Sequence, residues 1–478
     1  MRKHTMRGSK ETIMLIGGGN FGGREEVTLA AFLRSDNVEK VYLVPGNDAL
    51  FYPYQRDCRI ERVYDNEEKL VKLDKQDAQQ TMHDLAAFAE QVGALVFVGP
   101  ENPLSQGIVD IFEERGIPIV GPSKKAARLE GSKAWAKDVM ASLDIPIPRY
   151  AYFDDPDKAK DYIESHKRDF QVVVKADGLA EGKGSIVTGT VEKGNEAVFN
   201  LMEDPKRKYK EAGRTVVIEE RLYGEEFSFF LLTDGETILP LGWGRDYKSV
   251  RDFDHGKNTG GMGAFSPYGG HEEELTDLVM RRIVKPLIHG CRERYGIVYK
   301  GIMYIGGTFV RKDETINPYV FEINVRMGDP EAQVIYPRLK TDLALLSRAV
   351  VEGRLAEMGP LAWDPRYYLC VGLTSGPLRL KVPGKGWRSY PGYPDSYASG
   401  RVIQGLETLS PNMLVFHNGT TWDHERECFV TSGGRVLSIV GIGETLEEAR
   451  EKTYREVQKV TFDGCHYRCD IGRKPIPF

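Results

Sequence analysis

The feature that most constrains the fold is the alternation, within residues 12–121, of short apolar runs with amphipathic segments. Apolar runs occupy residues 12–16, 41–44, 94–98 and 117–120, and segments with helical spacing lie between them. Strands that alternate with helices form a parallel sheet covered by helices on both faces. The sequence therefore predicts a doubly wound, Rossmann-like α/β domain in residues 12–121.

The rest of the chain predicts further domains, since 478 residues are too many for one core. A second domain is predicted for residues 122–350, and short strands and helices within it indicate a small α+β lobe at about residues 145–222. Residues 365–478 are rich in turn residues and short strands, so we predict a separate C-terminal α+β domain.

Charge and composition exclude several classes of function. The formal net charge is −5, from 65 basic and 70 acidic residues, so no global field favours nucleic acid. The apolar run after the basic first ten residues is too short for a signal peptide, and no run of eighteen apolar residues suggests a membrane span. We expect a cytoplasmic protein with reduced cysteines. The alternative for the cysteines, a metal at Cys465 and His466, lacks a second ligand pair.

Three glycines follow the first predicted strand. Gly17, Gly19 and Gly22 match the dinucleotide fingerprint literally, but the second strand ends without the acidic residue that such a site uses. Backbone amides at a helix N-terminus, with Arg24 beside them, are suited to hold a phosphate or carboxylate. Anion binding is the favoured interpretation, while dinucleotide binding and a purely structural turn remain as alternatives.

A lysine at the end of a predicted strand precedes a loop with three glycines. Lys175 is followed by Gly178, Gly182, Lys183 and Gly184, which is not the Walker A order. Loop amides can donate hydrogen bonds to the oxygens of a triphosphate, while the strand lysine supplies a fixed positive charge. This pattern predicts a nucleotide site, and an ordinary glycine hairpin with solvated lysines is the alternative.

The segment from Glu219 to Leu222 ends another predicted strand. Free backbone groups at such a crossing can contact the adenine edge, and a carboxylate such as Glu226 can accept hydrogen bonds from ribose hydroxyls. An acidic turn without a ligand is the alternative.

The sequence Val-Phe-Glu-Ile-Asn-Val-Arg predicts a strand with one polar face. Because strand side chains alternate, Glu322, Asn324 and Arg326 share a face while their neighbours point to a core. Two oxygen ligands two residues apart suit Mg²⁺, and Arg326 can hold an anionic substrate group. A half-exposed strand with a polar face is the alternative.

The segment at residues 258–267 is too rich in glycine for a helix or strand. Asp246, Lys248, Arg251 and Asp252 lie just before it. We predict a mobile substrate loop, with a solvated linker as the alternative.

In this order, these motifs resemble those of the phosphoribosylamine–glycine ligase (glycinamide ribonucleotide synthetase) family of purine biosynthesis. The resemblance covers nearly the whole chain. It implies a multidomain ATP-grasp fold with an N-terminal doubly wound (pre-ATP-grasp) domain. The segments that carry it are residues 22–25, 45–47, 99–104, 121–123, 129–133, 174–179, 182–184, 258–263, 322–331 and 470–472.

The resemblance also implies roles for individual residues. ATP and Mg²⁺ are the implied cofactors, with Mn²⁺ as an alternative ion. The residues implied to contact ATP are Lys133, Lys175, Gly182, Lys183, Gly184, Glu219, Leu222 and Glu226, and those implied to hold the metal are Glu322 and Asn324. Those implied to bind substrate are Arg24, Glu25, Asn47, Glu101, Asp246, Asn258, Thr259, Gly260, Gly261 and Met262, with Arg326 and Lys248 as the catalytic residues.

The implied reaction is attack of the glycine carboxylate on the γ-phosphate of ATP. The resulting glycyl phosphate is then opened by the amine of a phosphorylated sugar. Such catalysis consists mainly of positioning and charge neutralisation. The implied partners are these small molecules, without nucleic acid or membrane, in a monomer or homodimer.

Several positions depart from the family pattern, most of them on the substrate side. Glu26 replaces a histidine, Tyr247 replaces another, Arg251 and Phe253 replace glycines, and Lys257 replaces a proline, while Val325, Met327 and Ala332 also differ. Two alternative functions therefore stay open. One is a related ligase that joins another small amino acid to another amine, and the other is a nucleotide-binding protein without catalysis.

Overall fold

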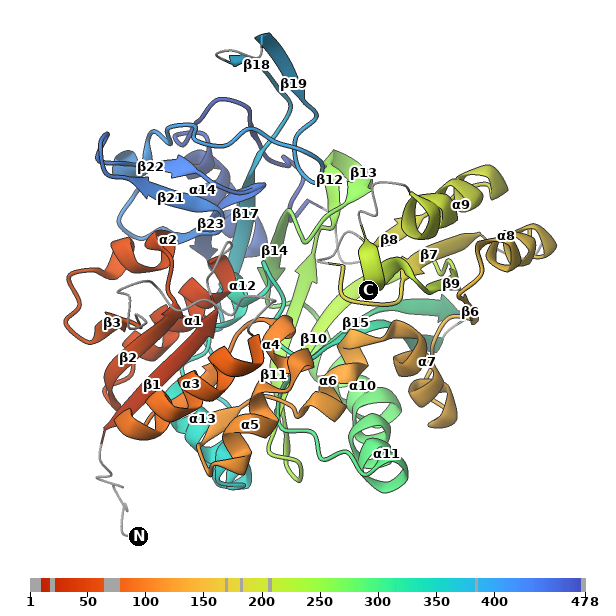
Figure 1. The fold of residues 1–478 in the computed structure, drawn as a ribbon, viewed down its shortest axis with the longest axis horizontal. Coiled ribbons are helices and arrows are strands. Elements are labelled where there is room, and N and C mark those ends of the chain that lie inside the picture. Colours follow the sequence, from red (N-terminus) through yellow and green to blue (C-terminus); the bar gives the residue numbers. More distant parts are fainter. Residues whose placement is uncertain are drawn as a thin grey trace.

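The computed structural model describes residues 10–17, 22–63, 78–167, 171–180, 184–204, 209–313, 315–382 and 386–473 (Figure 1). Within these residues no helix is both long enough and apolar enough to cross a membrane. All six cysteines are free thiols.

The N-terminal part is the predicted doubly wound domain. Its five strands are parallel and lie in the order β3-β2-β1-β4-β5. Residues 13–16 of β1 are completely buried, as expected for a parallel strand covered on both faces. The strand order reverses between β1 and β4, and in such sheets ligands bind at the carboxyl ends of those two strands. The elements are β1 (Glu11–Gly17), α1 (Gly23–Leu33), β2 (Val38–Pro45), α2 (Asp48–Phe51), β3 (Ile60–Arg62), α3 (Ala78–Val92), β4 (Leu95–Val98), α4 (Glu101–Gln106), α5 (Ile108–Glu114) and β5 (Ile119–Val120).

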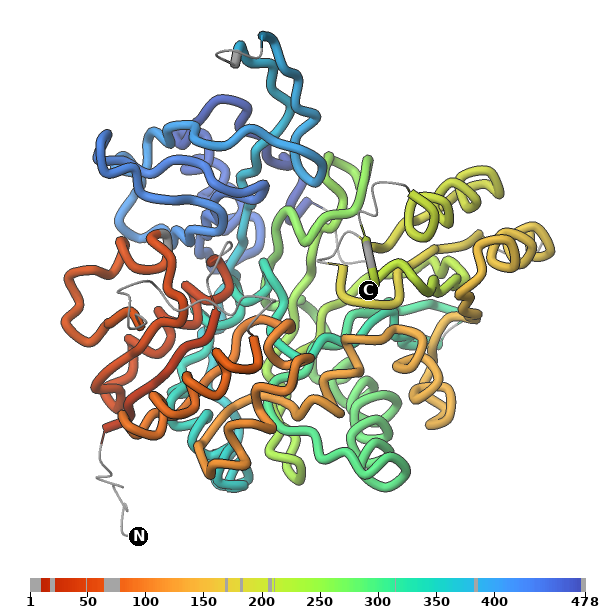
Figure 2. The backbone as a smooth tube through the Cα atoms, in the orientation of Figure 1, coloured from red at the N-terminus to blue at the C-terminus, as the bar shows by residue number. Residues whose placement is uncertain are grey.

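A small lobe follows the N-terminal part. Its antiparallel sheet has the order β6-β9-β7-β8 and its own core, which includes Val174 and Ile218. In Figures 1 and 2 this lobe lies to the right of the central sheet. The elements here and just before it are α6 (Lys124–Gly131), α7 (Lys133–Ser142), β6 (Tyr150–Phe153), α8 (Pro156–Ser165), β7 (Val172–Ala176), β8 (Ser185–Val187), α9 (Val191–Val198) and β9 (Val216–Glu220).

The centre of the molecule is a long antiparallel sheet. Its strands run in the order β16-β15-β10-β11-β14 and continue into β17-β23-β20. A long helix spans residues 272–295, with a π-helical turn in its middle. The elements are β10 (Glu225–Thr233), β11 (Ile238–Asp246), β12 (Ser249–Arg251), β13 (His255–Asn258), β14 (Gly263–Ser266), α10 (Glu272–Val279), α11 (Lys285–Tyr295), β15 (Gly301–Lys312), β16 (Thr315–Asn324), α12 (Ala332–Ile335) and α13 (Leu343–Val351).

The C-terminal part shares this sheet. β17 pairs with β14 over residues 368–371, so the strands that follow residue 365 extend the central sheet, although α14 covers a core of their own. The domain boundaries themselves remain predictions. The elements are β17 (Tyr367–Ser375), β18 (Leu378–Val382), β19 (Gly386–Tyr390), β20 (Leu414–His417), β21 (Thr420–Asp423), β22 (Cys428–Thr431), β23 (Arg435–Gly443), α14 (Leu446–Val457) and β24 (Cys465–His466).

Candidate active site

Two predicted substrate residues lie at the switch point of the N-terminal sheet. Arg24 is in the first turn of α1, just after β1, and Glu101 begins α4, just after β4. Glu25 is 3% exposed, and its carboxylate accepts from Arg24 at 2.9 Å. The turn itself includes residues 18–21, among them Gly19, which lie outside the described residues. The predicted anion site therefore has its cation and its helix N-terminus at the expected edge of the sheet.

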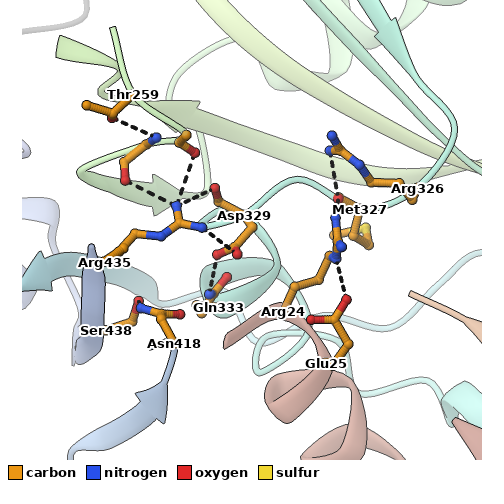
Figure 3. A network of polar contacts seen from close by, with 12 residues as sticks. Arg24, Glu25, Thr259, Arg326, Met327, Asp329, Gln333, Asn418, Arg435 and Ser438 are labelled. Carbon is orange, nitrogen blue, oxygen red and sulfur yellow. Dashed lines mark hydrogen bonds and ion pairs between the residues drawn. The ribbon is translucent and has the colours of Figure 1, made fainter. Parts of the chain in front are cut away.

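Arg326 joins this group from just beyond the end of β16. Its guanidinium lies 3.4 Å from a carboxylate oxygen of Glu101 and 2.7 Å from one of Glu130. Arg24 lies 3.8 Å from Glu101, and both arginines donate to the backbone carbonyl of Met327 (Figure 3). The sheet edge and the central strand thus form one ionic cluster.

Glu101 and Glu130 differ in their acidity. Burial raises the pKa of Glu101, but Arg326 and Arg24 together hold that pKa below its usual value. Burial raises the pKa of Glu130 to about 7, and Arg326 only partly opposes this effect. Glu130 also accepts from the backbone N–H of Val325 at 2.7 Å, which fixes the end of β16.

Three lysines, Lys133, Lys137 and Lys175, lie on the side predicted to bind the nucleotide. Ser132 caps α7 by accepting from Trp135 N at 3.2 Å, and this cap places Lys133 at the start of the helix. Lys133 donates to the carbonyl of Gly178 at 3.0 Å. Burial is the main cause that lowers the pKa of Lys133, while Glu322 raises it and Lys175 lowers it further. These groups share one electrostatic neighbourhood.

Lys175 projects from β7 toward the carboxylate of Glu219. Its Nζ lies 2.9 Å from both carboxylate oxygens and donates to Phe321 O at 3.0 Å. Lys137, which is 1% exposed, lies 3.2 Å from the same carboxylate. Two lysines on one carboxylate give a rigid, positively charged wall.

Glu322 and Lys248 form the predicted metal side. Glu322 Oε1 accepts from Lys248 Nζ at 2.8 Å. Burial alone raises the pKa of Glu322, but Lys248, Lys175 and Lys133 lower it to about 2, so the group is a carboxylate at neutral pH. Asn324 is two residues further along and, like Glu322, is half-buried. A carboxylate and an amide oxygen on one face fit the donors that Mg²⁺ prefers.

The segment after β13 differs from the prediction of an irregular, mobile loop over residues 258–267, because residues 263–266 form the buried strand β14. Thr259 and Met262 are buried, and Thr259 Oγ1 donates to the carbonyl of Lys248 at 2.8 Å. Arg435, from β23, donates to the carbonyls of Gly260 and Gly261 at 3.1 Å each (Figure 3). These hydrogen bonds hold the loop in place. Their donor Arg435 comes from β23, which is far along the chain from the loop.

Some predicted site residues have structural contacts or lie apart. Asn47 caps α2 by accepting from Leu50 N at 2.9 Å, although its side chain is near Gly22. Asp246 is half-buried, and the burial of its carboxyl group together with Glu331 raises its pKa. Leu222 is half-buried and Glu226 exposed. Gly182 and Lys183 lie outside the described residues.

The structure adds four residues near the site to which the sequence assigned no role, although Glu130 and Asp329 lie in segments that carry the family resemblance. They are Glu130, Lys137, Asp329 and Arg435, and Arg435 pairs with Asp329 at 2.5 Å. Lys137 had a usable signal, because it follows Lys133 by four residues on one helix and therefore faces the same side. Arg435 had none, since it reaches the loop from a distant strand.

Glu26, at the position of a family histidine, lies away from this cluster. It is completely buried, and its carboxylate accepts from the backbone N–H of His417 in β20. Burial raises the pKa of Glu26 well above its ordinary value. The Glu26 side chain therefore links α1 to β20 in the C-terminal part.

The His417 imidazole beside this contact should make stability depend on pH. Burial lowers its pKa to about 4, below the ordinary 6.5. Below pH 6.5 the imidazole of His417 binds a proton in the unfolded chain, whereas in the folded chain it stays neutral down to about pH 4. The free energy of unfolding therefore falls as the pH falls from 6.5 to 4. We expect the wild type to lose about 2 kcal/mol more than His417→Gln between pH 7.5 and 5.

Urea unfolding at both pH values measures this difference. Glu26 is present in both proteins, so its own titration cancels to first order. His424→Gln, at an exposed position, is the control and should follow the wild type. Equal pH dependence in wild type and His417→Gln would contradict the assignment.

Comparison with known proteins identifies the family of this chain. The three domains of phosphoribosylglycinamide synthetase match in order: the N domain at residues 11–130, the ATP-grasp (A) domain at 131–332 and the C domain at 389–474. The phosphoribosylamine–glycine ligase of Archaeoglobus fulgidus is 38% identical, with 94% of this chain and 97% of that protein covered. The chain belongs to the phosphoribosylamine–glycine ligase family. A second ligase of this family, from Halalkalibacterium halodurans, is 39% identical with 97% of each chain covered.

Solved structures confirm the predicted ATP-grasp fold. The phosphoribosylamine–glycine ligase of Thermotoga maritima has a TM-score of 0.73 at 29% identity and covers 96% of this chain and 100% of its own. The biotin carboxylase domain of 2-oxoglutarate carboxylase from Hydrogenobacter thermophilus has a TM-score of 0.65 at 16% identity, with 96% of this chain and 92% of that chain covered. The second likeness shows the fold alone.

Proposed function

We propose that this member of the phosphoribosylamine–glycine ligase family joins glycine to 5-phosphoribosylamine at the expense of ATP, as a step of purine biosynthesis in the cytoplasm. The observation that carries the proposal is the placement of Lys133, Lys175, Lys248 and Glu322 in one neighbourhood next to the ionic cluster of Arg24 and Arg326. In ligases of this kind a triphosphate and a carboxylic acid must meet.

The nucleotide is assigned to the cationic wall. Lys133 and Lys175 face the phosphates, and Glu219, Leu222 and Glu226 line the adenosine. Gly182, Lys183 and Gly184 complete this assignment from the β7–β8 loop. Fixed cations that need no reorganisation stabilise the charge that develops on a transferring phosphoryl group.

The metal is assigned to Glu322 and Asn324. Their oxygens fit Mg²⁺, with Mn²⁺ as the alternative ion, and such an ion would supply neutralisation of phosphate charge there. The Lys248 ammonium keeps Glu322 ionised and adds a second positive charge on the same side.

The acid and the amine are assigned to the ionic cluster. Arg326 and Arg24 can orient the glycine carboxylate and the sugar phosphate, with Glu25, Asn47, Glu101, Asp246 and residues 258–262 around them. A carboxylate oxygen attacks the γ-phosphorus and ADP leaves. The sugar amine then attacks the carbonyl carbon of glycyl phosphate, and phosphate leaves as the nitrogen loses a proton.

The departures from the family pattern do not favour another substrate. Arg251 is exposed and Phe253 is 64% exposed, while Tyr247 and Glu26 are buried away from solvent against other elements. Each of these four departures has a contact or an exposure that accounts for it without altering the ionic cluster.

The test is direct turnover. The chain is incubated with ATP, Mg²⁺, glycine and freshly generated phosphoribosylamine, and we expect ADP, phosphate and the amide in equal amounts. Reactions without glycine or without the amine are the controls, and Mn²⁺ replaces Mg²⁺ in a parallel series. No turnover here, together with turnover on another amino acid or amine, would assign the chain to a related ligase instead.

A further inference from the structure

The hairpin that carries Lys248 is tied to the end of the described chain. We call residues 247–258 the hairpin and residues 466–472 the clasp. Six hydrogen bonds join the clasp to the hairpin. His466 bonds to Val250 O (2.8 Å), and Arg468 donates to Ser249 O (3.0 Å) and to Asp254 (3.1 Å). Cys469 N donates to Asp252 (2.7 Å), Phe253 N to Asp470 (2.8 Å) and Gly472 N to the Tyr247 hydroxyl (3.0 Å).

The clasp is itself rigid. The Arg468 side chain is fully buried, and it forms a two-point ion pair with Asp470 at 2.8 and 2.7 Å. Burial raises the pKa of Asp470, but Arg468 and the N–H of Phe253 lower it below the ordinary value. The Tyr454 hydroxyl of α14 donates to Arg468 O at 2.7 Å, so the clasp is anchored on the C-terminal core. A buried arginine in a forked pair holds its position closely.

The hairpin turn needs such support. Phe253 and Asp254 have φ angles of 57° and 58°, in the left-handed region where a side chain is unfavourable. The Phe253 ring is 64% exposed, so packing does not hold it there. The clasp does contact both residues, through Asp470 and Arg468. Strained backbone persists where its surroundings fix it.

Lys248 lies between two residues that the clasp holds. Tyr247 and Ser249 on either side of Lys248 bond to Gly472 and Arg468, and the ammonium of Lys248 reaches Glu322 at 2.8 Å. A side chain that must meet a fixed partner depends on the position of its own backbone.

We propose that the clasp is a positioning element for the reaction: through the hairpin, Arg468 and Asp470 set where the Lys248 ammonium stands beside Glu322. This inference rests on the proposed function, because it assigns the clasp a part in the same chemistry. Arg468 and Asp470 are positioning residues and touch no substrate.

The test removes two of the hydrogen bonds between hairpin and clasp by changing residues of the hairpin. Asp252→Ala and Asp254→Ala, combined in one full-length chain, remove two contacts to the clasp without leaving a defect in the core. We expect amide hydrogen exchange of the hairpin to rise about tenfold while exchange elsewhere is unchanged, and kcat to fall about tenfold with the KM for ATP within about twofold. Asp463→Ala, 70% exposed and close to the clasp in sequence, should change neither.

A second variant approaches from the clasp. Arg468→Lys keeps the charge but loses the fork, and it should shift hairpin exchange and kcat in the same direction. Wild-type kcat or wild-type hairpin exchange in the Asp252/Asp254 variant would overturn the proposal, whatever Arg468→Lys does. If the wild type itself turned over no glycine and phosphoribosylamine, the proposed function would fail, and hairpin exchange would still decide whether the clasp holds the hairpin.

Discussion

Replacing Glu322 by alanine should reduce ADP formation about a thousandfold or more with any substrate pair. The carboxylate is ionised at every working pH, since Lys248, Lys175 and Lys133 lower its pKa to about 2 against the effect of burial. Its loss removes a proposed metal ligand and leaves Lys248 without its partner at 2.8 Å. Removing one preorganised group around a transferring phosphoryl group has effects of this size.

Steady-state ADP release, with the Mg²⁺ concentration varied, measures this effect. Asn324→Ala should weaken the Mg²⁺ dependence in the same direction. Glu451→Ala, at an exposed site on α14, is the control. A folded Glu322→Ala protein with full activity would remove the metal assignment.

Arg326→Met is expected to act on stability and on turnover together. Arg326 lies 2.7 Å from Glu130 and 3.4 Å from Glu101, and both carboxylates are largely buried. Without the guanidinium these charges lose their main partner, so the free energy of unfolding should fall by about 3–5 kcal/mol. Turnover should fall at least about a hundredfold, because the proposed contact to the substrate carboxylate is lost.

A double variant separates the two effects. Glu130→Gln in the Arg326→Met chain removes the buried carboxyl that has lost its cation, and it should recover part of the stability, but not the turnover. Urea unfolding and ADP release on the same samples give both quantities. Recovery of turnover together with stability would mean that Arg326 serves the fold alone.

Local patterns predicted much of the site. Strand alternation placed Glu322 and Asn324 on one face, and the order of strands and glycines placed Arg24 at the edge of a parallel sheet. Both placements depend only on residues that are close together in the sequence, so they can be predicted from the sequence. Site roles remain proposals, but the positions themselves follow from local rules.

Other parts of the site depend on distant pairing. The loop at residues 258–262 is buried because Arg435, far along the chain, supplies its donors. Glu130 meets Arg326 only because α6 packs against β16. Glycine content suggested mobility for the loop, and no local pattern could show which strand would cover it. For the same reason the sequence did not show that β17 extends the central sheet.

The pairing of β14 with β17 also bears on how the chain is made. The ribosome completes β14 well before β17, with α10 to α13 in between, so the growing chain carries an open strand edge during all of that synthesis. Such an edge can pair with other chains. The pairing of β17 with β14 therefore removes an edge that is open to other chains until residues 367–375 have been made.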